Sequence, residues 1–279
     1  MEKLIITAAV NGGITSRGKN PSVPYTPEEI AESIYQCWQA GASIARIHAR
    51  DSEGSPSYDF NVWREIVERV RERCDILINL STSGLNLPPH LAPEEAWNHL
   101  SLCPEIASFN CGSVNHGAKP FVNPPALAKK LAEDINRFNV IPEVEVYHSG
   151  VINEAVSLGK EGFLKLPMLF SFAMGIHGGV TAECKNLMNL IDNIPDDSMW
   201  SAIGIGRKQL PINIHTILLG GHVRTGLEDN VYYNKGELAT GSAQLVERIV
   251  RIARELGRDI SSPDETREAI GLNFERAVA

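Results

Sequence analysis

Short runs of β-branched and other apolar residues recur along the chain, and each run ends in a polar or glycine-rich corner. Segments with helical spacing of apolar residues follow most of these corners. Such runs predict β-strands. The first residues of successive strands mostly lie about 25 to 40 residues apart, which leaves room for a helix and two loops between one strand and the next. Eight strands are predicted in this way, over residues 4–10, 43–49, 76–80, 106–110, 141–147, 166–173, 200–205 and 222–225.

The segments between these strands carry helix signals. Thr26 is followed by Pro27 and then by Glu29 three residues after the threonine, which favours a capped helix start. Residues 61–73, 126–138 and 244–256 predict further helices, and the last of these is the most clearly amphipathic. Residues 210–219 have strand-like propensity, but they lie between the seventh and eighth strands and are therefore predicted as the crossover helix.

Eight alternating strand and helix units predict an α/β fold, a (β/α)8 barrel that forms a single domain over residues 1–279. A doubly wound parallel sheet is the alternative. In a barrel, the carboxyl ends of all strands surround one mouth, and the chemistry is expected there.

Composition narrows the function classes. The 279 residues are 43% hydrophobic, and the 26 basic and 34 acidic residues give a net charge of −8 without any long run of like charge. This charge pattern argues against nucleic-acid binding and against a membrane-surface role. We expect neither a secretion signal nor a membrane span, and the five scattered cysteines contain no C-x-x-C pair. A reducing cytoplasm fits these features best.

Polar side chains gather at the predicted strand ends. Because side chains alternate along a strand, Arg46 and His48 share one face, as do Ser108 and Asn110, and in a barrel that face can point inward. Glu143 and Glu145 form a third pair, and burying two carboxylates requires cationic groups or a metal opposite them. The densest group of polar residues and glycines lies in residues 220–230.

The whole chain resembles the β-keto acid cleavage enzyme family. The resemblance rests on several blocks in order: Ile5-x-Thr7-Ala8-Ala9, Asn20-Pro21-x-x-Pro24-x-Thr26-Pro27-Glu28-Glu29, His48-x-Arg50, Ser81-Thr82-x-Gly84, Pro142-Glu143-Val144-Glu145-Val146, Gly204-x-Gly206-Arg207, and Gly220-Gly221-His222-Val223-Arg224-x-Gly226-x-Glu228-Asp229-Asn230.

This resemblance implies a (β/α)8 barrel, a homotetramer and one divalent metal ion, usually Zn²⁺. It also implies a Claisen-type exchange in which a β-keto acid and acetyl-CoA give acetoacetate and a new acyl-CoA. By the same resemblance, His48 and Glu228 are metal ligands, Arg224 and Asp229 are catalytic, and Glu145 assists Asp229. The substrate-binding matches are Ser81, Thr82, Gly84, Ser108 and Asn110.

The chain departs from the family pattern at Arg46, which stands where the family has its first metal-binding histidine. A guanidinium stays protonated and cannot ligate a metal. Three interpretations follow: His177 or His222 supplies the third ligand; Arg46 replaces the metal as the group that polarises the keto oxygen; or the acyl exchange is changed or lost.

A second departure concerns the substrate. Family members that act on amino substrates carry a glutamate where this chain has Ile14, so the sequence argues against an amino keto acid. Arg46, as an added cation and candidate substrate ligand, suits an anionic or dicarboxylic keto acid. Three cationic residues are candidates for binding the phosphates of CoA: Arg50, Lys119 and Arg207.

Two alternatives to the acyl exchange remain at this stage. One is a metal-free barrel that binds a small carboxylic acid without catalysis. The other is an aldolase or hydrolase that acts on a different carbonyl compound, because a polarised carbonyl serves those reactions as well.

Overall fold

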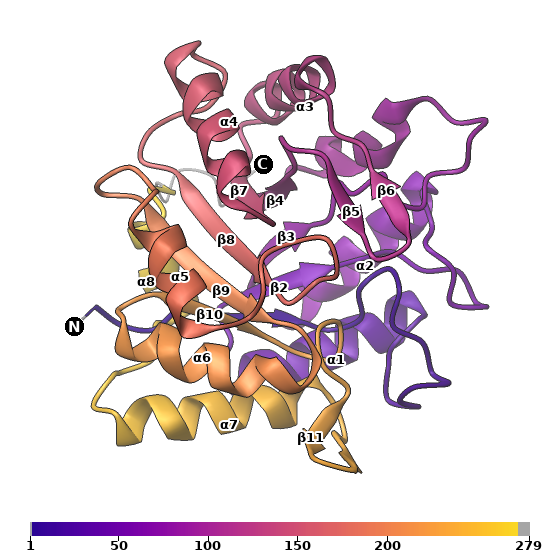
Figure 1. Cartoon of the computed structure of the whole chain (residues 1–279). Coiled ribbons are helices and arrows are strands. Elements are labelled where there is room, and N and C mark those ends of the chain that lie inside the picture. Colours follow the sequence, from indigo (N-terminus) through magenta and orange to yellow (C-terminus); the bar gives the residue numbers. More distant parts are fainter. Residues whose placement is uncertain (1, 273–279) are drawn as a thin grey trace.

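Eight parallel strands pair edge to edge and close into a barrel in the computed structural model, which describes residues 2–272. Residue 1 and residues 273–279 of the predicted domain lie outside this range. Around the barrel the order is β1, β10, β9, β8, β7, β4, β3 and β2, with β2 paired to β1 (Figure 1). The strands are β1 (Ile6–Ala9), β2 (Ile44–Ile47), β3 (Leu77–Leu80), β4 (Ile106–Phe109), β7 (Ile141–Val146), β8 (Leu169–Met174), β9 (Met199–Gly204) and β10 (His222–Thr225). The barrel prediction is confirmed, and an open doubly wound sheet is ruled out.

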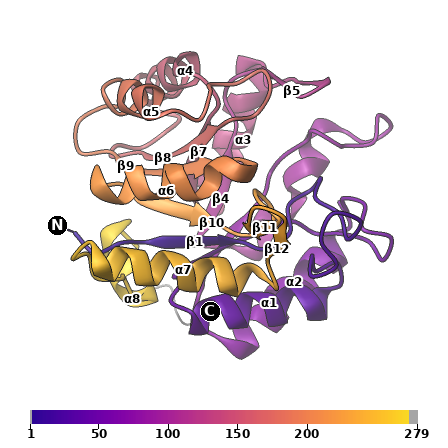
Figure 2. The ribbon, with the colours of Figure 1, turned by 60° about the horizontal axis from the view of Figure 1, so that its bottom comes forward.

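Helices cover the outside of the barrel (Figure 2). The predicted helices are all present, with ends that differ by a residue or two, including the crossover helix between β9 and β10. After β3, a 3-10 segment with a kink at Trp97 takes the place of an α-helix. The bounds are α1 (Pro27–Gln39), α2 (Phe60–Arg73), η1 (Pro93–Leu102), α3 (Pro125–Arg137), α4 (Ser149–Lys160), α5 (Cys184–Ile191), η2 (Gly206–Lys208), α6 (Gln209–Leu218), α7 (Ser242–Glu255) and α8 (Pro263–Ala269).

The start of α1 shows how the local sequence fixes an element. The backbone N–H of Glu29 donates to Oγ1 of Thr26 at 3.2 Å, and the backbone N–H of Thr26 donates to Oε2 of Glu29 at 3.0 Å. These two bonds satisfy donors that a helix terminus otherwise leaves unpaired. Apolar residues at helical spacing then bury one face of α1 against the barrel.

The inside of the barrel is layered. Near the amino ends of the strands, inward side chains are apolar and form one cluster: Ile5, Ile44, Leu77, Ile106, Ile141, Leu169 and Met199. Two residues further along the strands, the inward side chains are polar or charged: Thr7, Arg46, Asn79, Ser108, Glu143, Ser171, Ser201 and Arg224. The period of two in the strands therefore changes the lumen from apolar to polar toward the mouth.

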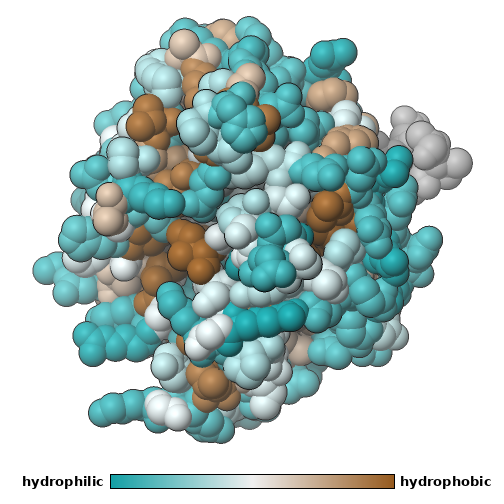
Figure 3. Space-filling view, turned by 90° about the vertical axis from the view of Figure 1, so that its right-hand side faces the viewer, coloured by the Kyte–Doolittle hydropathy of each residue, from teal (hydrophilic) through white to brown (hydrophobic). Residues whose placement is uncertain are grey.

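Two hairpins stand beside the mouth. One follows β4 and consists of β5 (Val114–His116) and β6 (Lys119–Phe121); the other follows β10 and consists of β11 (Tyr232–Asn234) and β12 (Glu237–Leu238). Both lie on the side to which the strands point in Figure 1, and this face is mainly hydrophilic with separate hydrophobic spots (Figure 3). Neither hairpin was predicted.

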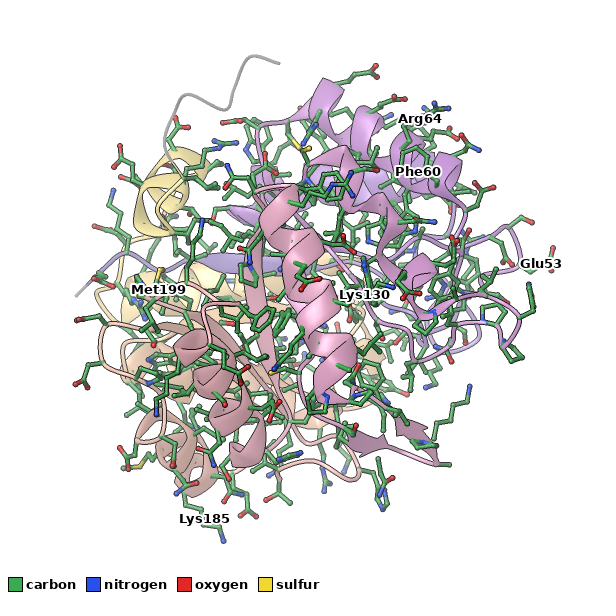
Figure 4. The ribbon with its side chains drawn as sticks, turned by 90° about the horizontal axis from the view of Figure 1, so that it is seen from above. Glu53, Phe60, Arg64, Lys130, Lys185 and Met199 are labelled. Carbon is green, nitrogen blue, oxygen red and sulfur yellow. The ribbon has the colours of Figure 1, made fainter. Side chains whose placement is uncertain are left out.

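The two ends of the barrel are far apart. Figure 4 shows Met199, at the start of β9, and Glu53, in the loop after β2, on opposite sides of the molecule. Within residues 2–272, none of the helices has the length and apolar character needed to cross a membrane.

Candidate active site

A cavity of about 930 Å³ opens at the carboxyl ends of the strands. Charged side chains from four parts of the barrel form its floor: Arg46 from β2, Glu145 from β7, Arg224 from β10, and the loop that follows β10. That loop supplies the adjacent acids Glu228 and Asp229. The structure thus brings together residues that are up to 183 positions apart, as the numbers of Arg46 and Asp229 show.

Arg224 connects three carboxylates. Its Nε and Nη2 donate to the two oxygens of Asp229, each at 2.9 Å. Nη2 also donates to Oε1 of Glu228 at 2.5 Å, and Nη1 lies 3.5 Å from Oε1 of Glu145. The planar guanidinium suits this bidentate pairing. Arg224 therefore fixes the orientation of Asp229 and offsets part of the negative charge.

Asp229 has the properties of a general base. Burial raises its pKa to about 6, and the neighbouring charges of Glu228 and Glu145 act in the same direction against the opposing effect of Arg224. Glu145 raises the pKa of Asp229, in line with its predicted role, although burial and Glu228 contribute more. A base with a pKa near 6 is ionised at neutral pH and still takes up a proton efficiently.

Arg46 is almost completely buried, with 1% of its surface exposed. Its Nη1 donates to Oδ1 of Asn79 at 3.2 Å and lies 3.7 Å from Oε2 of Glu143; its Nη2 donates to Oε1 of Glu145 at 3.1 Å and to Oγ of Ser81 at 3.4 Å. The expected cationic partners of the two glutamates are therefore Arg46 and Arg224.

His48 and Glu228 lie together. Nε2 of His48 is 3.4 Å from Oε1 of Glu228, while Oε2 of Glu228 is buried without a hydrogen-bond partner. Burial disfavours the charged form of Glu228, but Arg224 and His48 outweigh burial and hold its pKa well below the usual range. Glu228 is thus a carboxylate at neutral pH.

Gly12 makes room for this carboxylate. Its φ is +63°, and a Cβ there would lie 2.4 Å from Cγ of Glu228. We expect Gly12→Ala to lower the free energy of unfolding by about 1–3 kcal/mol for the backbone alone and, by displacing Glu228, also to lower kcat/KM. Gly257→Ala is the control, because its φ is +73° but nothing lies within 4 Å. Chemical denaturation and steady-state kinetics measure both effects, and equal kcat/KM for the two variants would contradict the expectation.

The five residues that match the family's substrate-binding positions do not line the cavity. The hydroxyl of Thr82 donates to the carbonyl of Ser108 at 2.7 Å, and the backbone N–H of Thr82 donates to Oγ of Ser108 at 3.0 Å. These two hydrogen bonds join the ends of β3 and β4. The side-chain amide of Asn110 is buried without a hydrogen-bond partner. The residues outside the cavity lining are Ser81, Thr82, Gly84, Ser108 and Asn110, and their role in substrate binding stays a prediction.

Sequence reasoning missed several residues that line the cavity. Tyr147 could have been found, because it follows Glu145 by two positions and shares its face; its hydroxyl donates to Oε2 of Glu145 at 3.3 Å. Ser83 and Tyr58 lie in loops, and His116 comes from the unpredicted hairpin after β4. No periodic signal marks these three positions.

The donor set does not fit the metal site that the resemblance implies. His48 and Glu228 offer two donor groups, the third position holds the guanidinium of Arg46, and catalytic zinc sites normally have three protein ligands. In the part of the chain that the structure describes, no group of three or more histidine, cysteine, aspartate or glutamate residues is arranged to hold a metal ion.

The two histidines considered as a third ligand lie in different places. His177 is exposed and lines the same cavity as His48. His222 begins β10 at the opposite end of the barrel, where its Nδ1 accepts a hydrogen bond from the backbone N–H of Ile5 at 3.1 Å. The interpretation of His222 as a ligand is therefore wrong, because the first residue of a strand lies far from the mouth.

His222 makes stability depend on pH. Burial, together with the nearby charge of Arg258, lowers its pKa from 6.5 to about 4. The imidazole of His222 takes up a proton at a higher pH in the unfolded chain than in the folded chain. The contribution of His222 to the free energy of unfolding is therefore fully present above pH 6.5 and is lost as the pH falls toward 4, by up to about 3 kcal/mol. We expect His222→Asn, which keeps an acceptor for Ile5, to show a shallower pH dependence of the free energy of unfolding. His90 is exposed, and the His90→Asn variant should match the wild type. If the free energy of unfolding changed with pH in the same way in all three proteins, His222 would not be the cause of the pH dependence.

Of the three candidate cations for CoA, Arg50 is already engaged. Its Nη2 donates to the carbonyl of Thr15 at 2.8 Å, its Nε donates to the carbonyl of Gly54 at 2.6 Å, and its guanidinium stacks on Tyr25. These contacts give Arg50 a structural role. Lys119 donates to Asn86 at 3.0 Å, and both Lys119 and Arg207 are exposed.

Fold and site together define a class: a (β/α)8-barrel enzyme with a buried carboxylate at the mouth, held by the guanidinium of an arginine. A model of the β-keto acid cleavage enzyme family matches residues 3–272. The chain belongs to this family of carbon–carbon bond-cleaving enzymes.

Several relatives cover nearly the whole chain. It is 41% identical to 3-keto-5-aminohexanoate cleavage enzyme of Fusobacterium nucleatum, over 98% of this chain and 99% of that protein. It is 32% identical to 3-oxoadipate:acetyl-CoA acetyltransferase of Cupriavidus necator, over 96% of this chain and 94% of that protein. Among solved structures, a ternary complex of ObcA with a C4-CoA adduct and oxalate superposes with a TM-score of 0.76 at 20% identity, over 90% of this chain and 68% of that chain. That likeness supports the barrel fold.

Proposed function

We propose that this chain, as a single barrel domain, converts a β-keto acid and acetyl-CoA into acetoacetate and a new acyl-CoA. The proposal rests on the surroundings of Asp229. This buried carboxylate has a raised pKa, accepts hydrogen bonds from Arg224 and lines the cavity. Family membership and the acetyl-CoA named for relatives, such as the 3-oxoadipate enzyme, support the same reaction.

The residues account for the proton transfers. Asp229 takes a proton from the carbon between the keto group and the carboxylate, and the electron pair of the broken C–H bond moves onto the keto oxygen. The enolate carbon attacks the thioester carbonyl of acetyl-CoA, and CoA leaves as a thiolate. The thiolate then attacks the original keto carbon, the bond to the central carbon breaks, and Asp229 returns its proton to the acetoacetate enolate.

Arg224 and Glu145 support this base. Arg224 holds both oxygens of Asp229, so the carboxylate cannot rotate away from the cavity. Glu145 accepts from Arg46 and from Tyr147 and contributes to the raised pKa of Asp229. A bound keto acid that covers the floor would exclude water and strengthen these charge interactions.

The substrate we propose is a β-keto acid without an amino group. Ile14 is 55% exposed and lines the cavity, and an isoleucine side chain offers nothing that pairs with an ammonium group. We expect Ile14→Glu to raise kcat/KM for 3-keto-5-aminohexanoate relative to an uncharged keto acid. The isosteric Ile14→Gln variant is the matched control, because it adds polarity without charge.

The test is an assay of acetoacetate formation with purified protein, acetyl-CoA and a panel of uncharged, dicarboxylic and amino β-keto acids. We expect acetoacetate and the matching acyl-CoA in equal amounts, with none formed when acetyl-CoA is left out. Turnover of a carbonyl compound without acetyl-CoA would favour an aldolase or hydrolase. Saturable binding of keto acids without turnover would favour a binding protein.

Further parts of the proposal rest on the resemblance. We propose a homotetramer and a cytoplasmic location, and light scattering of the purified protein tests the first. The divalent ion implied by the resemblance is left out of the proposed reaction, because the donor set around His48 and Glu228 is incomplete.

A further inference from the structure

Arg46 occupies the position from which a metal-binding side chain would face the cavity. Its guanidinium is held on two sides, by Glu145 on β7 and by Asn79 on β3, and it contributes to the cavity wall. Its Nε, however, is buried without a hydrogen-bond partner. A buried donor of this kind is costly unless a ligand satisfies it.

Two more buried atoms on the same floor lack hydrogen-bond partners: Nε2 of His48 and Oε2 of Glu228. All three side chains line one cavity. The other nitrogens of Arg46 bond to Asn79, Ser81 and Glu145, and those of Arg224 bond to carboxylates. The groups without a hydrogen-bond partner are therefore one cationic donor, one carboxylate oxygen and one imidazole nitrogen, which lies 3.4 Å from the other oxygen of Glu228. This set suits a small ligand that carries an oxyanion and a proton donor better than it suits a bare cation.

We propose that Arg46 takes the place of a metal ion and donates to the keto oxygen of the substrate as negative charge develops on it. The inference rests on the proposed function. When Asp229 takes the α-proton, the electron pair moves onto that oxygen, and a guanidinium already held in place stabilises the enolate without reorganisation. His48 and Glu228 then complete the substrate pocket and do not form part of a metal site.

The charges around Arg46 support this assignment. Glu145 and Glu143 pair with Arg46, while Asp229 and Glu228 pair with Arg224. A divalent cation between His48 and Glu228 would face two permanently charged guanidinium groups and would compete with Arg224 for Glu228. The keto oxygen needs only one donor, and Nε of Arg46 is a cationic donor that none of the four surrounding carboxylates occupies.

Zinc content is the first measurement. Wild type, Arg46→His and the double variant Arg46→His with Glu228→Gln are expressed with added zinc, desalted and analysed by elemental analysis. We expect little zinc in the wild type, about one ion per chain in Arg46→His, because it completes a three-ligand site, and little again in the double variant. About one zinc ion per wild-type chain would overturn the inference.

Calorimetric titration of the wild type with zinc gives a second readout that does not depend on the folding of any variant. We expect no saturable binding, whereas saturable binding of one equivalent would overturn the inference. For the kinetic role, Arg46→Gln is expected to lower kcat about 100- to 1,000-fold, with Arg46→Lys in between. Equal kcat for Arg46→Gln and wild type would show that Arg46 has no part in the reaction.

The two proposals fail in different ways. If no keto acid yields acetoacetate but the wild type lacks zinc, the proposed function fails and the displacement of the metal stands. If acetoacetate forms and the wild type holds zinc, the function stands and the inference about Arg46 fails.

Discussion

Asp229→Asn is expected to lower kcat by about 1,000-fold or more, because the amide cannot accept the α-proton of the substrate. The amide oxygen can still accept one of the two hydrogen bonds by which Nε and Nη2 of Arg224 hold Asp229 at 2.9 Å, whereas the amide nitrogen is a donor and loses the other. Steady-state kinetics with the best keto acid of the panel measures the effect.

Deuterium exchange isolates the proton transfer from the later steps. In D₂O, wild type should exchange the α-protons of the keto acid, and Asp229→Asn should not, as followed by NMR. Asp192→Asn, an exposed carboxylate at the end of α5, serves as the control and should match the wild type. A variant at Asp229 that keeps a tenth or more of the wild-type kcat would remove this residue from its role as the base.

Arg224→Met is expected to lower the free energy of unfolding by about 3–5 kcal/mol at pH 7, because it leaves buried carboxylates without their cationic partner. The guanidinium is buried and lies within 3.5 Å of Glu145, Glu228 and Asp229. Urea denaturation measures the change. The pKa of Asp229 should also rise, since Arg224 opposes the effect of burial on it.

Arg224→Lys is the matched variant for this prediction. It keeps the positive charge but cannot pair with both oxygens of Asp229, so its loss of stability should be smaller while its kcat remains well below that of the wild type. A loss below about 1 kcal/mol in Arg224→Met, the size typical of an exposed ion pair, would show that the carboxylates do not depend on this arginine.

The pattern of apolar and polar residues along the chain predicted most of the fold. All eight strands and the capped start of α1 follow from periodicity and from the residues at their ends, because these signals are local. The hairpins β5–β6 and β11–β12 were not predicted, since each strand spans only two or three residues. The segment between β3 and β4 contains several prolines, and it forms the 3-10 segment η1 where an α-helix would complete the strand and helix unit.

At the site, alternation along β7 correctly predicted that Glu143 and Glu145 share one buried face, and burial of two carboxylates required cationic groups or a metal opposite them; the structure places Arg46 and Arg224 there. For His222, the predicted strand over 222–225 already implied a place at the start of the strand, opposite the mouth, and the interpretation of His222 as a ligand did not take account of this. Alternation could not show that Thr82 and Ser108 bind each other, because their contact joins two different strand ends.

The sequence by itself determined the alternation of strands and helices and the polar face of the strands that carry Arg46, Ser108 and Glu143, because each of these is written within a few neighbouring residues. The family resemblance added that Arg46 stands where a metal ligand is expected. Only the tertiary structure decided that Arg46 reaches Glu145 on a strand 99 positions away, and that Arg224 grips Asp229 beside an unpartnered Glu228 oxygen. Barrel closure brings distant strand ends within hydrogen-bonding distance, and no local pattern records those distances.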